Sequence, residues 1–195
     1  MSLVSRMVES RTNYWFSFFA DSSLTVIFFV AGVAAFGGWL GCLLAILLGG
    51  LSWGLVEYSF HRWFFHLKGS PAYASHLRHH EEPDELIAMP WFVTTVIVVL
   101  LWLLLRLFLP VSPASFFMAT VTAGYVFYGL LHHVFHHLDI NVMPGKLLRR
   151  AWSYHKIHHA LPASNFGVTT SFWDRVFGTH YRSAARRKPK HQLAA

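Results

Sequence analysis

Ten of the fourteen histidines in this chain fall into four short clusters, each at the edge of a long apolar segment. Neutral imidazole is the commonest metal-ligating side chain, and it suits iron, zinc, copper and nickel. The clusters therefore predict a metal centre built almost wholly from imidazole. The candidate ligands are His61 and His66, then His76, His79 and His80, then His132 and His136, and finally His155, His158 and His159.

The spacing within each cluster indicates how the rings would be arranged. Residues three and four apart share one face of a helix, so HxxHH at 76–80 and at 155–159 would present three rings to one side. HxxxH at 132–136 would present two. His61 and His66 are five residues apart and do not share a face of an α-helix. Their spacing indicates either a helix end where the chain unwinds or one ring reaching each of two ions.

Ten imidazoles exceed what one ion needs, since zinc takes about four ligands and octahedral metals about six. Two metal ions with about five ligands each would use them all. We expect iron, with zinc possible in the purified protein, and O₂ as the co-substrate. Two irons coupled to O₂ would supply an oxidant able to attack an unactivated C–H bond, and the apolar surroundings suggest an acyl chain or another membrane lipid as the substrate.

Two residues beside the clusters are candidates for a catalytic role. Glu57 lies one helical turn before His61, where it could hydrogen-bond a ligand imidazole, and an intramembrane acid is a functional candidate in its own right. The alternatives for Glu57 are an interfacial position or a pairing with Arg62. Tyr154 adjoins the last cluster and could donate to a bound oxygen species, with simple packing as the alternative.

The other histidines, and one acid near the end of the chain, are expected to lie outside the metal centre. His133 and His137 lie about 100° round the helix from the candidate ligands, which favours a supporting role beside a ligand or an interfacial position. Because they also have HxxxH spacing, a register in which they replace His132 and His136 stays open. His180 and His191 are isolated. Asp174 is expected to be structural, capping a turn or pairing with its neighbour.

The composition indicates a membrane protein: 54% of the residues are hydrophobic and only 13% are charged. The single cysteine, Cys42, excludes a disulfide framework and a thiolate zinc site. The net charge is +7, but ten of the sixteen Lys and Arg residues lie between Lys146 and Lys190. A basic tail after membrane segments is typical of the cytoplasmic side of a membrane, and we expect no nucleic-acid partner.

The apolar segments predict four transmembrane helices in two hairpins, and therefore an all-α integral membrane fold. About 20 apolar residues span a bilayer. The expected helices are 15–36 and 39–60, joined at Gly37–Gly38, and 91–109 and 114–131, joined at Pro110 and Pro113.

An even number of spans puts both termini on one side, which the basic residues mark as cytoplasmic. We expect one membrane domain over 1–195, with a cytosolic N-terminus at 1–13 and a flexible basic tail at 182–195. All four histidine clusters would then meet in a cytosolic helical cap.

The sequence resembles the fatty acid hydroxylase and sterol desaturase superfamily from about Glu57 to Thr179. The resemblance rests on EYSFHRWFFH (57–66), HLRHH (76–80), YGLLHHVFHH (128–137) and YHKIHHALPASNFGVTTSFWDRVFGT (154–179). The last stretch is similar to the fatty acid 2-hydroxylase branch. The resemblance implies a four-helix membrane anchor, a cytosolic cap with a di-metal site held by the ten histidines, and O₂-dependent hydroxylation of an acyl chain at carbon 2.

Two departures from that branch bear on the expectations. Gly129 stands where the branch usually has Asp after Tyr128. The N-terminal cytochrome-b-type haem domain of many eukaryotic relatives has no counterpart in the printed sequence, which predicts a separate electron donor, either ferredoxin or a cytochrome-b-type protein with its reductase. We expect a bacterial inner membrane, or the endoplasmic reticulum if the protein is eukaryotic.

Two other functions remain open from the sequence. The nearer one is a sterol or carotenoid hydroxylase or desaturase of the same superfamily, although the HDGxxH pattern of the carotenoid branch is absent. The more distant one is a metal transporter, which would need ligands near the bilayer midplane, whereas these clusters flank the apolar segments.

Overall fold

The computed structural model describes residues 3–182, and every regular element in that range is helical. The elements are α1 (Leu3–Val8), α2 (Arg11–Ala34), α3 (Trp39–Ser59), a π-helix (Phe60–Phe65), α4 (Tyr73–Glu81), α5 (Trp91–Leu105), α6 (Val111–His137), a 3-10 helix (Ile140–Val142), α7 (Gly145–Ala160) and α8 (Phe172–Val176). The all-helical prediction is therefore confirmed. The basic tail predicted at 182–195 lies outside the described residues, apart from Arg182.

Within residues 3–182, three helices are long and apolar enough to cross a membrane: α2, α3 with its continuation to Phe65, and α6. Large apolar side chains such as Val26, Ile27 and Leu47 are exposed on their outer faces, as expected for surfaces that contact lipid. The chain is therefore a membrane protein. The fourth predicted helix is present as α5, but its 15 residues are fewer than the roughly 20 that span a bilayer core.

The two predicted hairpin turns lie close to their expected positions. Gly38 has a φ of +145°, a conformation that glycine adopts readily and other residues rarely do. Pro110 is the N-cap of α6, and Pro113 lies in its first turn, where no amide donor is needed. Pro113 therefore does not interrupt the helix, and α6 runs from Val111 to His137, beyond both predicted ends.

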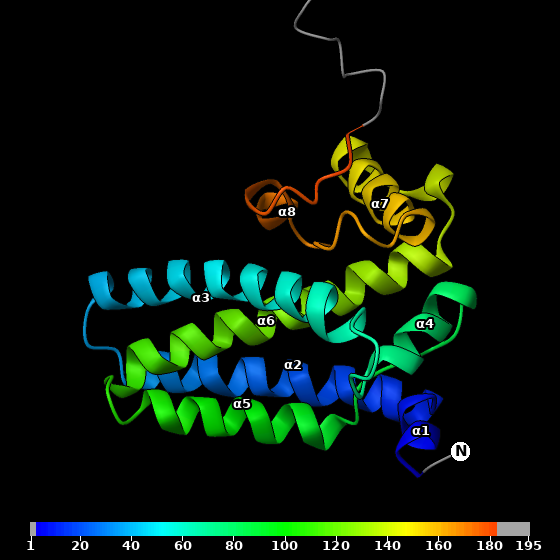
Figure 1. Ribbon diagram of the computed structural model, residues 1–195. Helices are drawn as coiled ribbons and strands as arrows, with labels where there is room; N and C mark the ends of the chain where they lie inside the picture. The colour runs from blue at the N-terminus through cyan, green and yellow to red at the C-terminus, as the bar shows by residue number, and fades with distance from the viewer. Residues whose placement is uncertain (1–2, 183–195) are drawn as a thin grey trace, which may run out of the picture.

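α6 lies at the centre of the bundle and packs against both α2 and α3, while α5 packs against α2 (Figure 1). Glycines allow α3 and α6 to approach closely. A Cβ on Gly49 would lie 2.8 Å from the backbone oxygen of Phe117, and a Cβ on Gly124 would lie 2.4 Å from the Trp53 ring. This close packing fixes the ends of α3 and α6 relative to each other.

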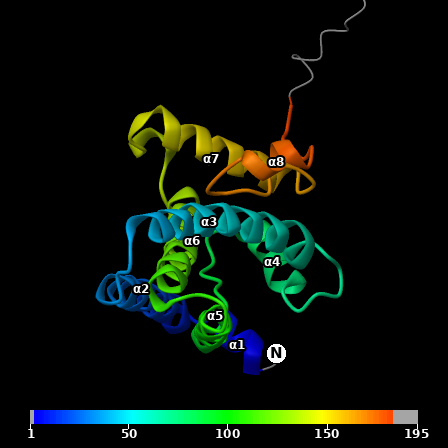
Figure 2. The ribbon, with the colours of Figure 1, turned by 90° about the vertical axis from the view of Figure 1, so that its left-hand side faces the viewer.

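The C-terminal ends of α3 and α6 point toward the same side as α4 and α7 (Figure 1). Figure 2 shows α7 and α8 as a layer on the α3 side of the bundle, and α8 contacts α3. The predicted helical cap is therefore present. It brings together the four segments that carry the histidine clusters.

Candidate metal centre

The structure brings the ten candidate ligands together as two groups of five. Within each group the ring donor atoms lie within 4.8 Å of one another. We call them the π-helix group and the α6 group. The π-helix group contains His61, His66, His76, His80 and His158, and the α6 group contains His79, His132, His136, His155 and His159.

Each HxxHH cluster contributes to both groups. On α4, His76 and His80 join the π-helix group while His79 joins the α6 group. On α7, only His158 joins the π-helix group, while His155 and His159 join the α6 group. All three rings of each cluster join the histidine groups, but they divide between the two, because at about 100° per residue the i+3 ring lies about 100° from the i+4 ring.

His61 and His66 lie at the start and the end of the π-helix turn that follows α3. The wider i→i+5 turn of a π-helix brings residues five apart onto one side. Their rings are stacked with centroids 5.4 Å apart, and both belong to one group. The chain therefore does depart from α-helical winding here, and the alternative of one ring for each ion is wrong.

The ring nitrogens are spaced as ligands of a single ion would be. Two nitrogens bound at right angles, each about 2.1 Å from an ion, lie about 3.0 Å apart. The Nε2 atom of His66 lies 3.0 Å from that of His76 and 3.2 Å from that of His158. In the α6 group the Nε2 atom of His155 lies 2.8 Å from that of His136 and 3.2 Å from that of His159.

Further ring nitrogens in both groups lack an ordinary partner. Within the described part of the chain, the Nε2 atoms of His61, His79 and His132 are buried without a hydrogen bond. Buried polar atoms without partners are rare and call for an explanation. A metal ion bound by each group would supply that partner.

Burial keeps these imidazoles neutral. Burial, and then repulsion from the neighbouring His80, lowers the pKa of His79 to about 3. Burial likewise lowers the pKa of His158 to about 3 and that of His66 to about 4, although the Ser164 carbonyl opposes the change at His158. Neutral rings offer the lone pairs that a metal requires.

Two rings of the π-helix group are oriented by backbone carbonyls of the segment 164–169. The Nδ1 atom of His158 donates to the Ser164 carbonyl at 2.8 Å, and that of His61 donates to the Phe166 carbonyl at 2.5 Å. Donation from Nδ1 fixes the tautomer and leaves the Nε2 lone pair free for a metal.

Asp174 holds this segment in place. Its fully buried carboxylate accepts hydrogen bonds from the backbone N–H groups of Phe166 and Gly167, both at 2.8 Å, and from the Thr179 hydroxyl at 2.7 Å. It does not form the expected ion pair with Arg175 within the described residues. The predicted structural role of Asp174 is therefore confirmed, but the WDRVFGT stretch gave no local signal of the segment that Asp174 binds.

Glu57 binds the same segment from α3. Its carboxylate accepts hydrogen bonds from the Val168 and Thr169 backbone N–H groups and from the Thr169 hydroxyl. The expected hydrogen bond to a ligand imidazole is absent among the described residues. Glu57 therefore acts on His61 indirectly, through the segment that carries the Phe166 carbonyl.

Tyr154 lies next to His155 on α7, but its ring faces His180, with centroids 5.4 Å apart. Its hydroxyl is buried beside the Asp174 carboxylate, and burial raises its pKa above the usual value. The structure therefore does not bring Tyr154 to either histidine group.

His133, His137 and His180, the other histidines within residues 3–182, belong to neither group. The Tyr14 hydroxyl and the Nδ1 atom of His133 are 3.0 Å apart, and the His137 ring lies against that of His133. The Nδ1 atom of His180 donates to the Tyr181 carbonyl at 2.7 Å. His191 lies beyond the described residues.

A mainly apolar cavity of about 590 Å³ adjoins both groups. It is bounded by α2, α5 and α6, by the π-helix and by α4, and its lining includes His76, His79 and His132. Pockets for small apolar ligands have volumes of about 300–1,000 Å³. An apolar chain can therefore reach the histidine groups from between the helices.

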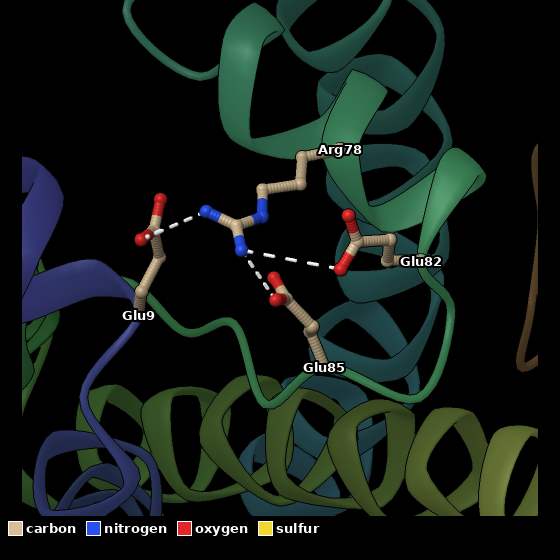
Figure 3. Close-up of polar contacts among 4 residues, drawn as sticks. All are labelled: Glu9, Arg78, Glu82 and Glu85. Atoms are coloured by element: carbon tan, nitrogen blue, oxygen red, sulfur yellow. Dashed lines mark hydrogen bonds and ion pairs between the residues drawn. The ribbon is translucent and has the colours of Figure 1, made fainter.

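A cluster of charges joins α4 to the N-terminal part of the chain near this cavity. Arg78 forms ion pairs with Glu9 at 3.1 Å, with Glu82 at 4.0 Å and with Glu85 (Figure 3). The Ala88 backbone N–H donates to the carbonyl of Val8, and both of these residues line the cavity. Arg78 thus connects the ligand-bearing helix to the segment that enters α2.

Comparison with known proteins gives one family. The family model described as fatty acid hydroxylase matches residues 46–179. The chain is 32% identical over 145 residues to dihydroceramide fatty acyl 2-hydroxylase FAH2 of Arabidopsis thaliana, covering 70% of this chain and 60% of that protein. It is 34% identical over 147 residues to the ceramide very long chain fatty acid hydroxylase scs7 of Schizosaccharomyces pombe, covering 68% of this chain and 41% of that protein.

The fold is also similar to that of a solved structure, full-length scs7p with only the hydroxylase domain visible. The TM-score is 0.75 and the identity 26%, over 93% of this chain and 70% of that one. The chain thus spans 60% and 41% of these two curated relatives, but nearly all of it matches the hydroxylase-domain structure.

Proposed function

The chain belongs to the fatty acid hydroxylase family, and on this premise we propose that it hydroxylates a fatty acyl chain at carbon 2 using O₂. The observation that carries the proposal is the pair of five-histidine groups at the end of an apolar cavity. The 2-hydroxylase relatives support the choice of carbon 2. The names of these relatives give fatty acids or fatty acyl chains as their substrates, which does not support the sterol, carotenoid or transport alternatives.

Each histidine group would hold one metal ion, with iron as the working metal and zinc possible in a purified sample. The ions would supply the activation of O₂. One oxygen atom enters the C–H bond and the other leaves as water, with two electrons and two protons delivered from outside. A separate electron-donor protein, a ferredoxin or a cytochrome-b-type protein with its reductase, would supply these electrons.

The protein's own residues would bind and position the chain. Apolar side chains such as Phe18, Val93 and Val126 line the cavity and would exclude water from the reacting carbon. The rings of His76, His79 and His132 border the cavity, so the carbon placed beside them would be the one that reacts. Positioning decides which carbon is oxidised, since a displacement of about 1 Å can cost about 100-fold in rate.

The proposal includes a membrane topology. The ligand-bearing ends of α3 and α6 would face the cytoplasm, where the electron donor is available, and both termini would lie on the same side. The basic residues of α7, among them Lys146, Arg149 and Arg150, support this orientation. The relatives named above are eukaryotic, so they lend no support to a bacterial inner membrane.

The test is lipid mass spectrometry on cells that express the wild type or the His158→Ala variant with a matched electron donor. We expect a lipid that gains the mass of one oxygen at carbon 2 with the wild type only. Loss of two hydrogens instead would identify a desaturase. No lipid change in the presence of bound metal and donor would refute the proposed activity.

A further inference from the structure

The apolar cavity ends at a carboxyl group inside the membrane layer. The deepest lining residues on its three helices are Asp21 on α2, Ile97 on α5 and Tyr125 on α6. Asp21 and Tyr125 each lie seven residues from the lining residue nearest the cap on the same helix, namely Tyr14 and His132, and Ile97 lies seven residues after Pro90, the N-cap of α5. Seven helical residues correspond to about 10 Å, so the three helices end the cavity at one common depth.

Below this level the bundle is packed. Phe28, Val98 and Met118 form a buried cluster with Leu24 and Trp102 packed against it. A chain that enters from the histidine groups therefore meets Asp21 before it meets a closed apolar core.

Asp21 differs from the other two buried acids of the described chain. Glu57 and Asp174 each accept three hydrogen bonds. The carboxyl of Asp21 forms none within residues 3–182, although Asp21 is only 5% exposed and lines the cavity. The Asp21 carboxyl therefore has the cavity rather than the protein to supply its partner, and an ionisable residue within a membrane span is a functional candidate.

We propose that Asp21 binds a hydroxyl group on the acyl chain of the substrate, an inference that rests on the proposed function. The walls between the histidines and Asp21 are mainly apolar, which favours a neutral hydroxyl over a cation because a charge would be desolvated along the whole path. An extended chain of single bonds advances about 1.2 Å per bond, as in a protein backbone. About 10 Å therefore places the carbon that carries the hydroxyl roughly eight bonds beyond the carbon that is oxidised.

The experiment compares the binding of decanoic acid and 10-hydroxydecanoic acid to the purified, metal-loaded full chain in detergent, by calorimetry. Oxidation of carbon 2 places the 10-hydroxyl at the depth of Asp21. We expect the wild type to bind the hydroxylated chain up to about ten-fold more tightly, the effect of one net hydrogen bond. Asp21→Leu removes this preference, and Asp21→Asn, which keeps an acceptor, retains part of it.

Asp84→Asn is the matched control, because Asp84 is an exposed acid that does not line the cavity. Equal affinity of the wild type for the two chains would overturn the inference, since water would then satisfy Asp21. A preference for the hydroxylated chain that is unchanged in both Asp21 variants would also overturn the inference. Either result leaves the hydroxylase proposal standing, provided that acyl chains without a hydroxyl group are oxidised. If the protein prefers the hydroxylated chain but oxidises no lipid, the hydroxylase proposal is refuted and the binding site at Asp21 remains.

Discussion

The two histidine groups are positioned in different ways. The α6 group is built from regular α-helices, with His132 and His136 one turn apart on α6 and His155 and His159 one turn apart on α7. The π-helix group needs a local change of winding and two carbonyls from the irregular segment 164–169. The first group follows from helical spacing, and the second depends on hydrogen bonds between distant parts of the chain.

This difference predicts where each group is vulnerable. The carboxylates of Glu57 and Asp174 hold the segment that orients His61 and His158. No comparable loop supports the α6 group among the described residues. Changes at these two acids should therefore affect the π-helix group first.

The largest effects should come from removing one ligand from either group. We expect His158→Ala and His132→Ala each to reduce product formation by more than about 100-fold, because even partners outside the ligand sphere are worth about 10–100-fold. The measurement is the 2-hydroxylated lipid formed per unit of protein. His180→Ala is the control, and a ligand variant that keeps a tenth of the activity would show that its ring is not a ligand.

Changing Asp174 should separate the two groups. Asp174→Asn keeps one oxygen acceptor but replaces the other with an NH₂ donor, so either the Phe166 or the Gly167 N–H group loses its acceptor and the segment should shift. We expect the metal affinity of the π-helix group to fall by about 10–100-fold while the α6 group keeps its metal, as a competitive metal titration would measure. Glu57→Gln should have the same effect to a smaller degree.

The control for these acids is Asp139→Asn, since Asp139 accepts one hydrogen bond in an exposed turn. Equal weakening of both groups by Asp174→Asn would contradict the proposed difference between them.

A substitution where α3 packs against α6 should lower the stability of the whole protein, and so affect both histidine groups alike. A Cβ on Gly49 would lie 2.8 Å from a backbone oxygen of α6, whereas one on Gly50 would lie 3.9 Å from Thr120. We expect Gly49→Ala to destabilise the protein by about 1–3 kcal/mol, as overpacking does, and Gly50→Ala to be nearly neutral. Thermal unfolding in detergent measures this, and equal melting temperatures for the two variants would show that the helices do not constrain each other here.

The smallest effect is expected at Arg78. Its ion pairs with Glu9, Glu82 and Glu85 are at least partly exposed to solvent, and such pairs contribute little to stability. Arg78→Gln should leave the melting temperature and the metal content unchanged at both low and high salt. A large, salt-dependent loss of metal would instead show that this connection holds α4 in place.

Local patterns in the sequence predict much of this molecule. The apolar segments predicted the long helices, and Gly37–Gly38 predicted the first turn. The four clusters identified the ten histidines that the structure brings together. Each of these features depends on residues close together in the chain, where helical spacing and turn preferences apply.

Other features depend on contacts that spacing cannot reveal. The division of HxxHH between two groups depends on which neighbours flank α4 and α7. The role of Asp174 depends on the fold of the segment that it binds, and that of Glu57 on residues more than 100 positions away. α5 ends at Leu105, four residues before the end predicted from its apolar segment.

The most direct test of this account is the number of metal ions bound per chain. The wild type, reconstituted with ferrous iron and measured by plasma mass spectrometry, should saturate at two ions. His158→Ala and His132→Ala should each retain one, and the double variant none. A wild-type protein that saturates at a single ion would contradict the assignment of two separate five-histidine sites.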